Sequence, residues 1–308
     1  MKIIFFGTPD FAVYSLDALI KSERHETLAA VTQPDRPRGR GNKVSFSPVK
    51  EAALAAGVPV LQPERVKSDV FYNKLKKYGA DIFIVAAYGR VLPERLLTLP
   101  KYGAVNVHAS LLPKYRGAAP IQRAIMNGEK KTGVTIIQMD KGIDTGDMIL
   151  KKEIEITETD TGGSLHDKLA LLGAESLLAA LFLLEKGEAR PEKQDDCAAS
   201  HAPMLDKETG RVNWNGEPEK IIDQIRALCP SPGAYTFYKG GQIKIYSGAK
   251  TESPPGSPGE IFFTGGRLSV KANGGGVIIN EMQKTGGKRM DSADFARGVR
   301  IAEGESFE

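Results

Sequence analysis

The chain has 308 residues, of which 41% are hydrophobic and 26% charged, and its formal net charge at pH 7 is +4. This length predicts two domains, and the composition is that of an ordinary globular protein. No apolar stretch approaches the roughly 20 residues that cross a bilayer, and the two cysteines, Cys197 and Cys229, supply neither a disulfide framework nor the ligand spacing of a metal site. We therefore expect a cytoplasmic protein that binds no metal and no membrane.

The first half of the chain alternates short apolar runs with amphipathic runs. This pattern is typical of βαβ units and predicts an α/β fold with a Rossmann-like, mostly parallel sheet and helices on both faces. Apolar residues are consecutive within DIFIVAAYG, residues 81–89, as expected of a central strand that is covered on both faces. The predicted strands are 2–6, 27–32, 58–61, 81–86, 104–108, 133–138 and 148–156, and the predicted helices are 11–21, 48–56, 68–78, 93–97 and 120–127.

The second half begins with a long helix in residues 161–188, with Ser164 as its expected N-cap and Leu at helical spacing. The polar segment 187–209 loses this periodicity, so we expect a linker at 189–208. After a short helix at 218–228, two-residue Gly turns separate strand-like runs, which predicts antiparallel hairpins in an OB-like β-barrel. The predicted domains are therefore 1–188 and 209–308.

The surplus of basic over acidic residues is concentrated in one Pro- and Gly-rich segment. Residues 33–50 carry five Arg and Lys against one acid, a surplus as large as the net charge of the whole chain, +4. From residue 206 onward, 14 basic residues face 13 acidic ones. Arg and Lys on such a segment can reach phosphates and exposed bases of a nucleic acid. The ordinary alternative is a solvated charged loop.

A candidate site lies in GAVNVHASLLPKYRGAAP, residues 103–120, where a β-branched run ends in a loop. Asn106 and His108 are two residues apart, so on a strand their side chains leave the same face. In open α/β sheets, ligands bind beyond the carboxyl ends of the strands. An Asn and a His at a strand end can also be no more than a capping and packing pair.

A second segment, GVTIIQMDKGIDTGDMIL, places three acids in a tight loop between two strands: Asp140, Asp144 and Asp147. Any of them could meet His108, because neighbouring parallel strands lie about 5 Å apart. An amide, an imidazole and a carboxylate together can stabilise a developing oxyanion and move a proton. No Ser or Cys occupies a nucleophile elbow. We therefore expect direct transfer between two bound substrates, without a covalent enzyme intermediate.

Several motifs, in order along the chain, resemble the methionyl-tRNA formyltransferase family. The strongest are NVHASLLPKYRGAAPIQRAI and GVTIIQMDKGIDTGDMI, joined by IIFFGTPDFA, TQPDRPRGRGNK and VAAYGRVLP. The resemblance is dense over about the first 190 residues and weaker afterwards, through GRVNW, GQIKIYSGAK and GGKRMDSADF.

This resemblance implies transfer of a formyl group from 10-formyltetrahydrofolate, a co-substrate, to the α-amino group of methionine on initiator tRNA. It also implies that Asn106, His108 and Asp144 are the catalytic residues. The remaining implied contacts are Ser110, Leu111, Leu112 and Pro113 for the folate, and Arg36, Arg38, Arg40 and Lys43 for the tRNA. The C-terminal domain would bind tRNA as well, and we expect a monomer.

Two alternatives keep the same scaffold. A related 10-formyltetrahydrofolate-dependent formyltransferase would use another acceptor, such as glycinamide ribonucleotide, an amino sugar or water. A non-catalytic tRNA-binding protein would have no need of all three predicted catalytic side chains. Neither alternative requires the basic segment and the C-terminal barrel together with those side chains.

Overall fold

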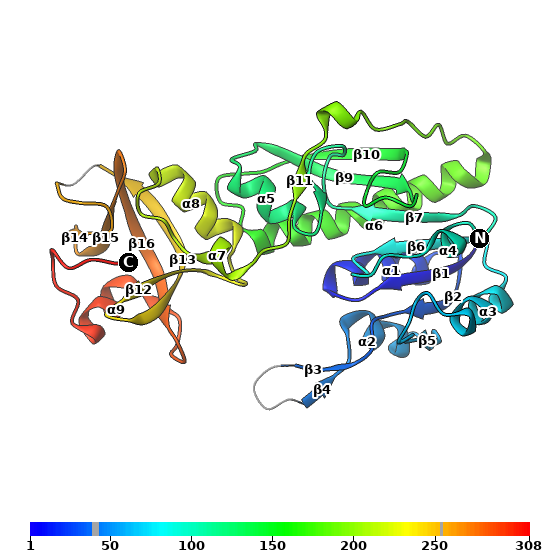
Figure 1. Ribbon diagram of the computed structural model, residues 1–308, viewed down its shortest axis with the longest axis horizontal. Helices are drawn as coiled ribbons and strands as arrows, with labels where there is room; N and C mark the ends of the chain where they lie inside the picture. The colour runs from blue at the N-terminus through cyan, green and yellow to red at the C-terminus, as the bar shows by residue number, and fades with distance from the viewer. Residues whose placement is uncertain (39–42, 253–254) are drawn as a thin grey trace. The chain divides into compact units, whose positions relative to one another are not determined.

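The computed structural model describes residues 1–38, 43–252 and 255–308. The chain folds into two compact units that interleave along the sequence. The first unit comprises Met1–Gly117, Lys131–Ile154 and His166–Ala202. The second comprises Ala118–Lys130, Glu155–Leu165 and Pro203–Glu308. Figure 1 shows the helices and strands of both.

A seven-stranded sheet forms the centre of the first unit in the described residues, in the order β10-β9-β7-β6-β1-β2-β5. Its pairs from β7 to β5 are all parallel, whereas β9 runs antiparallel to β7. The predicted Rossmann-like, mostly parallel sheet is therefore confirmed. The strands are β1 (Lys2–Gly7), β2 (Glu26–Val31), β5 (Val60–Leu61), β6 (Ile82–Ala86), β7 (Ala104–His108), β9 (Lys131–Gln138) and β10 (Met148–Glu155).

The central strand β6 is buried at every residue, as its unbroken apolar run predicts. Phe6 on β1 and Phe83 on β6 belong to one cluster of buried residues, with ring centroids 5.2 Å apart. Burying side chains of this size contributes about 1.5–3 kcal/mol each. This core fixes the carboxyl ends of β1, β2 and β6 side by side.

Hydroxyl side chains cap the starts of two helices in this part of the chain, those that begin at Pro48 and at Asp69. Ser47 accepts a hydrogen bond from the Lys50 amide at 3.2 Å, and Ser68 accepts one from the Phe71 amide at 3.3 Å. The helices are α1 (Asp10–Lys21), α2 (Pro48–Ala55), α3 (Asp69–Tyr78), α4 (Glu94–Leu97) and α6 (Gly162–Lys186). No helix of the described residues has the length and apolarity to cross a membrane.

The long helix α6 begins earlier than the sequence predicts. Thr161 Oγ1 accepts from the Ser164 amide at 3.1 Å, and Ser164 Oγ accepts from the Thr161 amide at 2.9 Å. This reciprocal pair is the capping-box geometry, in which Thr161 is the N-cap and Ser164 is the third helical residue. The prediction of Ser164 as the N-cap is therefore wrong by one helical turn.

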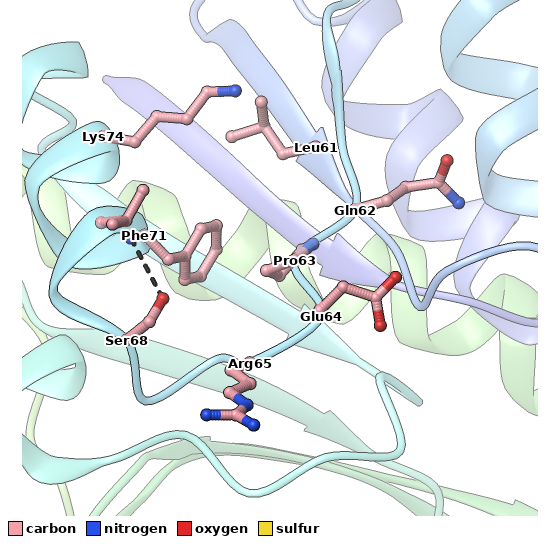
Figure 2. A pocket seen from close by; sticks show the side chains of 9 residues that line it. Leu61, Gln62, Pro63, Glu64, Arg65, Ser68, Phe71 and Lys74 are labelled. Atoms are coloured by element: carbon pink, nitrogen blue, oxygen red, sulfur yellow. Dashed lines mark hydrogen bonds between the residues drawn. The ribbon is translucent and has the colours of Figure 1, made fainter.

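A cavity of about 370 Å³ lies beside the end of β5 and the start of α3 (Figure 2). Its lining includes the apolar residues Leu61, Pro63 and Phe71, together with Lys74. Ser68 also lines it, but its hydroxyl accepts from the Phe71 amide and so serves the helix. None of the side chains predicted for catalysis or for folate lines this cavity.

The second unit is built on an antiparallel sheet in the order β12-β13-β16-β15-β14, with β17 paired to β16. The predicted antiparallel C-terminal domain is confirmed. Its strands are β12 (Ala234–Tyr238), β13 (Gly241–Thr251), β14 (Ile261–Thr264), β15 (Arg267–Ala272), β16 (Gly275–Lys284) and β17 (Met290–Asp291). Its helices are α5 (Pro120–Met126), α7 (Lys207–Gly210), α8 (Pro218–Ala227) and α9 (Ser292–Val299).

Two-residue turns set the register of these hairpins, as the Gly pattern predicts. Lys239 and Gly240 join β12 to β13 with φ of 48° and 74°, and Gly265 and Gly266 join β14 to β15 with φ of 55° and 80°. Positive φ at both central residues is the turn geometry that matches the twist of a hairpin.

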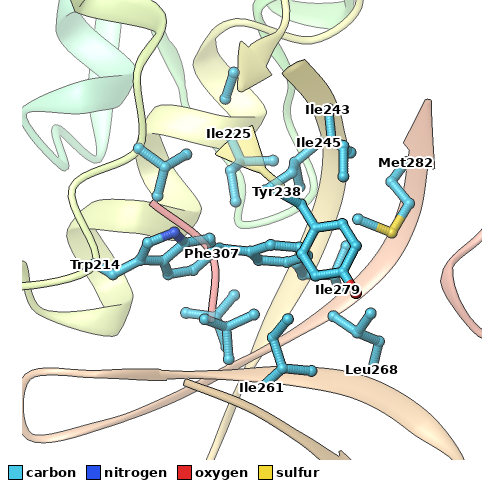
Figure 3. Packing of buried hydrophobic residues seen from close by; sticks show 14 of the residues in the cluster. Trp214, Ile225, Tyr238, Ile243, Ile245, Ile261, Leu268, Ile279, Met282 and Phe307 are labelled. Carbon is cyan, nitrogen blue, oxygen red and sulfur yellow. The ribbon is translucent and has the colours of Figure 1, made fainter. Parts of the chain in front are cut away.

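The core of the second unit contains the single tryptophan of the chain (Figure 3). Trp214 is 4% exposed, and its ring stacks on Phe307 with centroids 6.1 Å apart. Its indole Nε1 donates to Thr236 Oγ1 at 3.0 Å, so the one polar atom of the ring is satisfied.

Candidate active site

His108 ends strand β7 and is 5% exposed. Its Nε2 atom lies 2.9 Å from the carbonyl oxygen of Tyr115. A carbonyl can only accept, so Nε2 carries a proton and donates it. Tyr115 has φ of 63°, which lies in the left-handed region. The other ring nitrogen, Nδ1, faces Asp144 Oδ2 at 3.5 Å.

Asp144 contacts the predicted amide as well. Its Oδ1 atom accepts from Asn106 Nδ2 at 3.3 Å, and its Oδ2 accepts from the Gly117 amide at 2.9 Å. A carboxylate oxygen only accepts, so the Asn106 amide must present its nitrogen here. The structure therefore brings Asn106, His108 and Asp144 together from β7 and from the loop between β9 and β10.

The route by which Asp144 reaches His108 differs from the one expected. Strand β9 is antiparallel to β7, with Ile137 opposite Asn106 and Thr135 opposite His108. The chain therefore leaves β9 at the end of β7 remote from His108, and the loop must fold back to reach it. Asp144 has φ of 55°, a left-handed conformation that Asp adopts more readily than most residues.

The other two acids of this loop have different contacts. Asp140 Oδ1 accepts from the Gly142 amide at 2.9 Å and from Thr145 Oγ1 at 2.7 Å, so it shapes the loop from within. Asp147 pairs through its backbone, where its carbonyl accepts from the Gln138 amide at 2.8 Å. Of the three candidates left open by the sequence, Asp144 is the acid that meets His108.

The four residues predicted to contact folate follow β7. Ser110 is fully buried, and its hydroxyl donates to the Lys114 carbonyl at 2.7 Å. Leu112 is 1% exposed and packs with Ile137 and Met148. Leu111 and Pro113 are half-buried. Ser110 and Leu112 therefore fix the turn, whereas Leu111 and Pro113 retain surface that a ligand can contact.

The basic segment forms a short hairpin of β3 (Arg36–Arg38) and β4 (Lys43–Ser45), in which Arg38 is opposite Lys43. The Arg36 side chain is exposed. Arg40 lies outside the described residues, as do the side chains of Arg38 and Lys43.

A polar cluster holds the base of this hairpin. Lys50 Nζ donates to Gln62 Oε1 at 2.8 Å and pairs with the Asp35 carboxylate. Gln62 Nε2 donates to Asp35 Oδ1 at 2.9 Å. The hydrogen bond from Lys50, followed by that from Gln62, lowers the pKa of the Asp35 carboxyl below its ordinary value. Lys50 Nζ also lies 3.9 Å from the centre of the Phe46 ring.

Sequence reasoning missed two residues that touch the site through their backbones. The Tyr115 carbonyl holds His108, and the Gly117 amide holds Asp144. Side-chain type carries no signal for such contacts, although Gly117 has φ of 117°, a conformation that favours glycine. Among the described residues, no group of three or more His, Cys, Asp and Glu side chains could hold a metal ion.

Most of the chain matches known families. Residues 1–181 match the family model described as formyl transferase, and residues 204–300 match formyl transferase, C-terminal domain. A methionyl-tRNA formyltransferase from Caldanaerobacter subterraneus subsp. tengcongensis is 51% identical over an alignment of 309 residues, gaps included, which covers 99% of this chain and 99% of that one. A methionyl-tRNA formyltransferase from Pelotomaculum thermopropionicum is 47% identical over 307 residues, covering 99% of this chain and 97% of that one.

Solved structures share the fold at lower identity. HypX from Aquifex aeolicus in complex with tetrahydrofolic acid has a TM-score of 0.65 to this chain at 20% identity. The match covers 99% of this chain and 48% of that one, so this chain spans about half of its length.

Proposed function

The chain belongs to the formyl transferase family, and we propose that it transfers the formyl group of 10-formyltetrahydrofolate to the α-amino group of methionyl initiator tRNA. The observation that carries the acceptor is 51% identity, over nearly the whole of both chains, to a methionyl-tRNA formyltransferase. The product, N-formylmethionyl-tRNA, serves translation initiation. Because that tRNA is used in the cytoplasm, we place the protein there, as a monomer.

The reaction forms a bond between the amine nitrogen and the formyl carbon, and it breaks the bond between that carbon and N10 of the folate. One proton passes from the amine to N10. After the new bond forms and before the bond to N10 breaks, the formyl oxygen carries negative charge. An oriented N–H donor stabilises this charge. Removing one such donor typically lowers turnover by 10²–10³-fold.

Asn106 is placed to be that donor. One N–H of its amide points to Asp144 Oδ1, and the other makes no hydrogen bond to the described residues. Asp144 therefore fixes the orientation of the amide and leaves one donor for the formyl oxygen. An amide held in this way needs no reorganisation as charge develops.

His108 and Asp144 form the part that can move a proton. Nε2 of His108 is occupied by the Tyr115 carbonyl, so only Nδ1 can exchange a proton, and Nδ1 faces Asp144. Their separation of 3.5 Å is longer than a strong hydrogen bond, and such contacts often tighten when substrate binds. We assign this pair to carrying the amine proton towards N10, through water where needed.

The remaining residues are assigned to binding the two substrates, folate and tRNA. Leu111 and Pro113, on the turn built by Ser110 and Leu112, contact the folate. The β3–β4 hairpin contacts tRNA phosphates with Arg36, Arg38, Arg40 and Lys43. We assign the transfer to residues 1–188 and a second tRNA contact to residues 209–308; of the segment between them, the residues as far as Ala202 belong to the first unit.

One assay tests the acceptor. Purified protein is mixed with 10-formyltetrahydrofolate, and release of tetrahydrofolate is followed by absorbance. Release is expected only when methionyl initiator tRNA is added, with formylmethionine recovered from the tRNA. Turnover with glycinamide ribonucleotide or an amino sugar nucleotide, and not with methionyl-tRNA, would show that the proposed acceptor is wrong. Release of tetrahydrofolate without any acceptor would identify a hydrolase.

A further inference from the structure

Gln194 lies in the polar segment that the sequence marks only as a linker, yet its side chain contacts the loop that carries Asp144. Its Nε2 atom donates to the carbonyl oxygens of Asp144 and Gly146, each at 2.8 Å. Its Oε1 atom accepts from Arg116 Nε at 2.9 Å. The side chain is half-buried and makes all three contacts within the first unit.

The three contacts fix the orientation of this amide by their chemistry. Two carbonyl oxygens can only accept, and a guanidinium can only donate. A flipped amide would place its oxygen against both carbonyls and its nitrogen against Arg116. Gln194 therefore matches this position in a way that neither Glu nor an apolar side chain of similar size can.

Arg116 extends the same network to the other side of the site. Its side chain is almost fully buried, and it donates to Gln194 Oε1 and to Asp196 Oδ1 at 2.8 Å. Arg116 stands between Tyr115, whose carbonyl holds His108, and Gly117, whose amide holds Asp144. Gln194 thus joins the backbone that carries Asp144 to the backbone that holds both partners of the proposed proton path.

The backbone after Gln194 runs beside the same residues. The Ser200 hydroxyl accepts from the Tyr115 amide at 2.9 Å, and the Ser200 carbonyl accepts from the Arg116 amide at 2.8 Å. Strand β11 (His201–Ala202) then pairs in parallel with β8 (Arg116–Gly117). These contacts give the segment a fixed place against the site, so Gln194 is not a side chain of a free linker.

We propose that Gln194 is a positioning residue for Asp144: through its two donors it holds the loop in the left-handed turn that brings the carboxylate to Asn106 and His108. The turn at Asp144, with φ of 55°, is sparsely populated for residues other than glycine, so it persists only where its surroundings fix it. Gln194 supplies that support at the residue itself and at Gly146. The inference rests on the proposed formyl transfer.

The test is a double-mutant cycle with Gln194→Met, which removes all three hydrogen bonds and keeps the volume. In single-turnover formylation, Gln194→Met is expected to lower the rate tenfold or more, with the KM for tRNA and for folate changed less than twofold. In the Asp144→Ala background the same substitution is expected to change the rate less than twofold. If the two substitutions each lower the rate in the double variant by as much as they do alone, so that their effects multiply, the proposal is overturned.

The control variant is Lys193→Ala, next along the chain and exposed, which is expected to keep the wild-type rate. If Gln194→Met melts below the assay temperature, Gln194→Glu carries the same test. It retains an acceptor for Arg116 but places an oxygen against the two carbonyls. A wild-type rate in Gln194→Glu would overturn the proposal.

A second readout does not depend on activity, and so separates failure of this inference from failure of the proposed function. The Gly117 amide donates to Asp144 Oδ2 at 2.9 Å, and its hydrogen exchange therefore reports the position of the carboxylate. Exchange at Gly117 is expected to be at least tenfold faster in Gln194→Met than in Lys193→Ala. Unchanged protection of Gly117 would overturn the positioning role even in a protein that formylates no tRNA.

Discussion

Oδ2 of Asp144 lies 3.5 Å from Nδ1 of His108, and the side chains of the two residues are only 16% and 6% exposed. Water screens such a pair less than it screens an exposed one. Each partner is also fixed by backbone that the other does not touch, His108 by the Tyr115 carbonyl and Asp144 by the Gly117 amide. The loss of one partner therefore leaves the other in place, without the second group that the proposed proton path requires.

This relationship predicts the effect of removing either side chain. His108→Ala and Asp144→Ala are each expected to lower the single-turnover rate of formylation at least a hundredfold, because the proposed proton path loses one of its two groups. Circular dichroism is expected to show a folded protein in both cases. The matched control is Glu175→Gln, an exposed acid on α6. A rate within threefold of wild type in either alanine variant would remove that residue from the mechanism.

Asn106 gives a separate prediction, because its proposed role is a hydrogen bond that strengthens as charge develops. Asn106→Ala is expected to lower kcat by 10²–10³-fold and to leave the KM for folate nearly unchanged. Steady-state kinetics at saturating tRNA measures both. A rise in KM at unchanged kcat would show instead that the amide binds substrate and transition state equally.

The basic side chains of the β3–β4 hairpin lead to a prediction about tRNA binding and its dependence on salt. Replacing Arg36, Arg38 and Lys43 together by Ala is expected to raise the KM for tRNA and not that for folate. Each lost phosphate contact reduces the magnitude of the slope of log affinity against log salt by about 0.7–0.9, so the loss of three contacts is expected to reduce it by about two to three. Alanine at Lys74, Lys76 and Lys77, exposed on α3, removes the same charge elsewhere. An equal effect of that triple would show that overall charge, and not the hairpin, attracts the tRNA.

The ion pair at the base of the hairpin predicts a pH dependence of stability. The folded-state pKa of Asp35 is lowered from its ordinary value of 3.8, chiefly by the hydrogen bond from Lys50. A carboxyl with a depressed pKa stabilises the fold above its unfolded pKa, and this contribution is lost as pH falls through the folded pKa. Asp35→Asn is therefore expected to lower Tm at pH 7, and the difference from wild type is expected to shrink below pH 4. A difference that stays constant from pH 7 to pH 3 would contradict this account.

Hydrophobic pattern and turn chemistry account for what the sequence predicted well. The apolar run at 82–86 specifies a strand covered on both faces, and Gly at 240 and 265–266 specifies hairpin turns, because few other residues adopt those backbone angles. Asn106 and His108 were predicted on one face for the same kind of reason, the period of a strand.

Strand direction leaves no such local signal. More than twenty residues join β7 to β9, and a connection of that length permits either orientation, so the antiparallel pairing and the folded-back loop of Asp144 were not predicted. The N-cap of α6 was misplaced because Thr161 and Ser164 both carry a hydroxyl at helix-starting positions. The sequence carries no signal for Gln194, because hydrogen bonds from one side chain to distant carbonyls produce no periodicity.

The different burial of the two cysteines leads to a prediction about the rates at which their thiols are alkylated. Cys197 is exposed on the short helix η1 (Asp196–Ala198), whereas Cys229 is 7% exposed in the second unit and burial raises the pKa of its thiol. The thiolate is the reactive form, so iodoacetamide at pH 7.5 is expected to label Cys197 rapidly and Cys229 at least a hundredfold more slowly. Peptide mass spectrometry after timed quenching measures both rates.

Cys229 and Trp214 belong to the same unit, which allows a sharper form of this prediction. In rising urea, the labelling of Cys229 and the red shift of the single tryptophan are expected to follow one transition, because both residues are buried in the second unit. Cys197→Ser removes the exposed thiol and leaves this transition unchanged. Labelling of Cys229 at urea concentrations where Trp214 emission is still native would show that the thiol opens independently of the core around the indole.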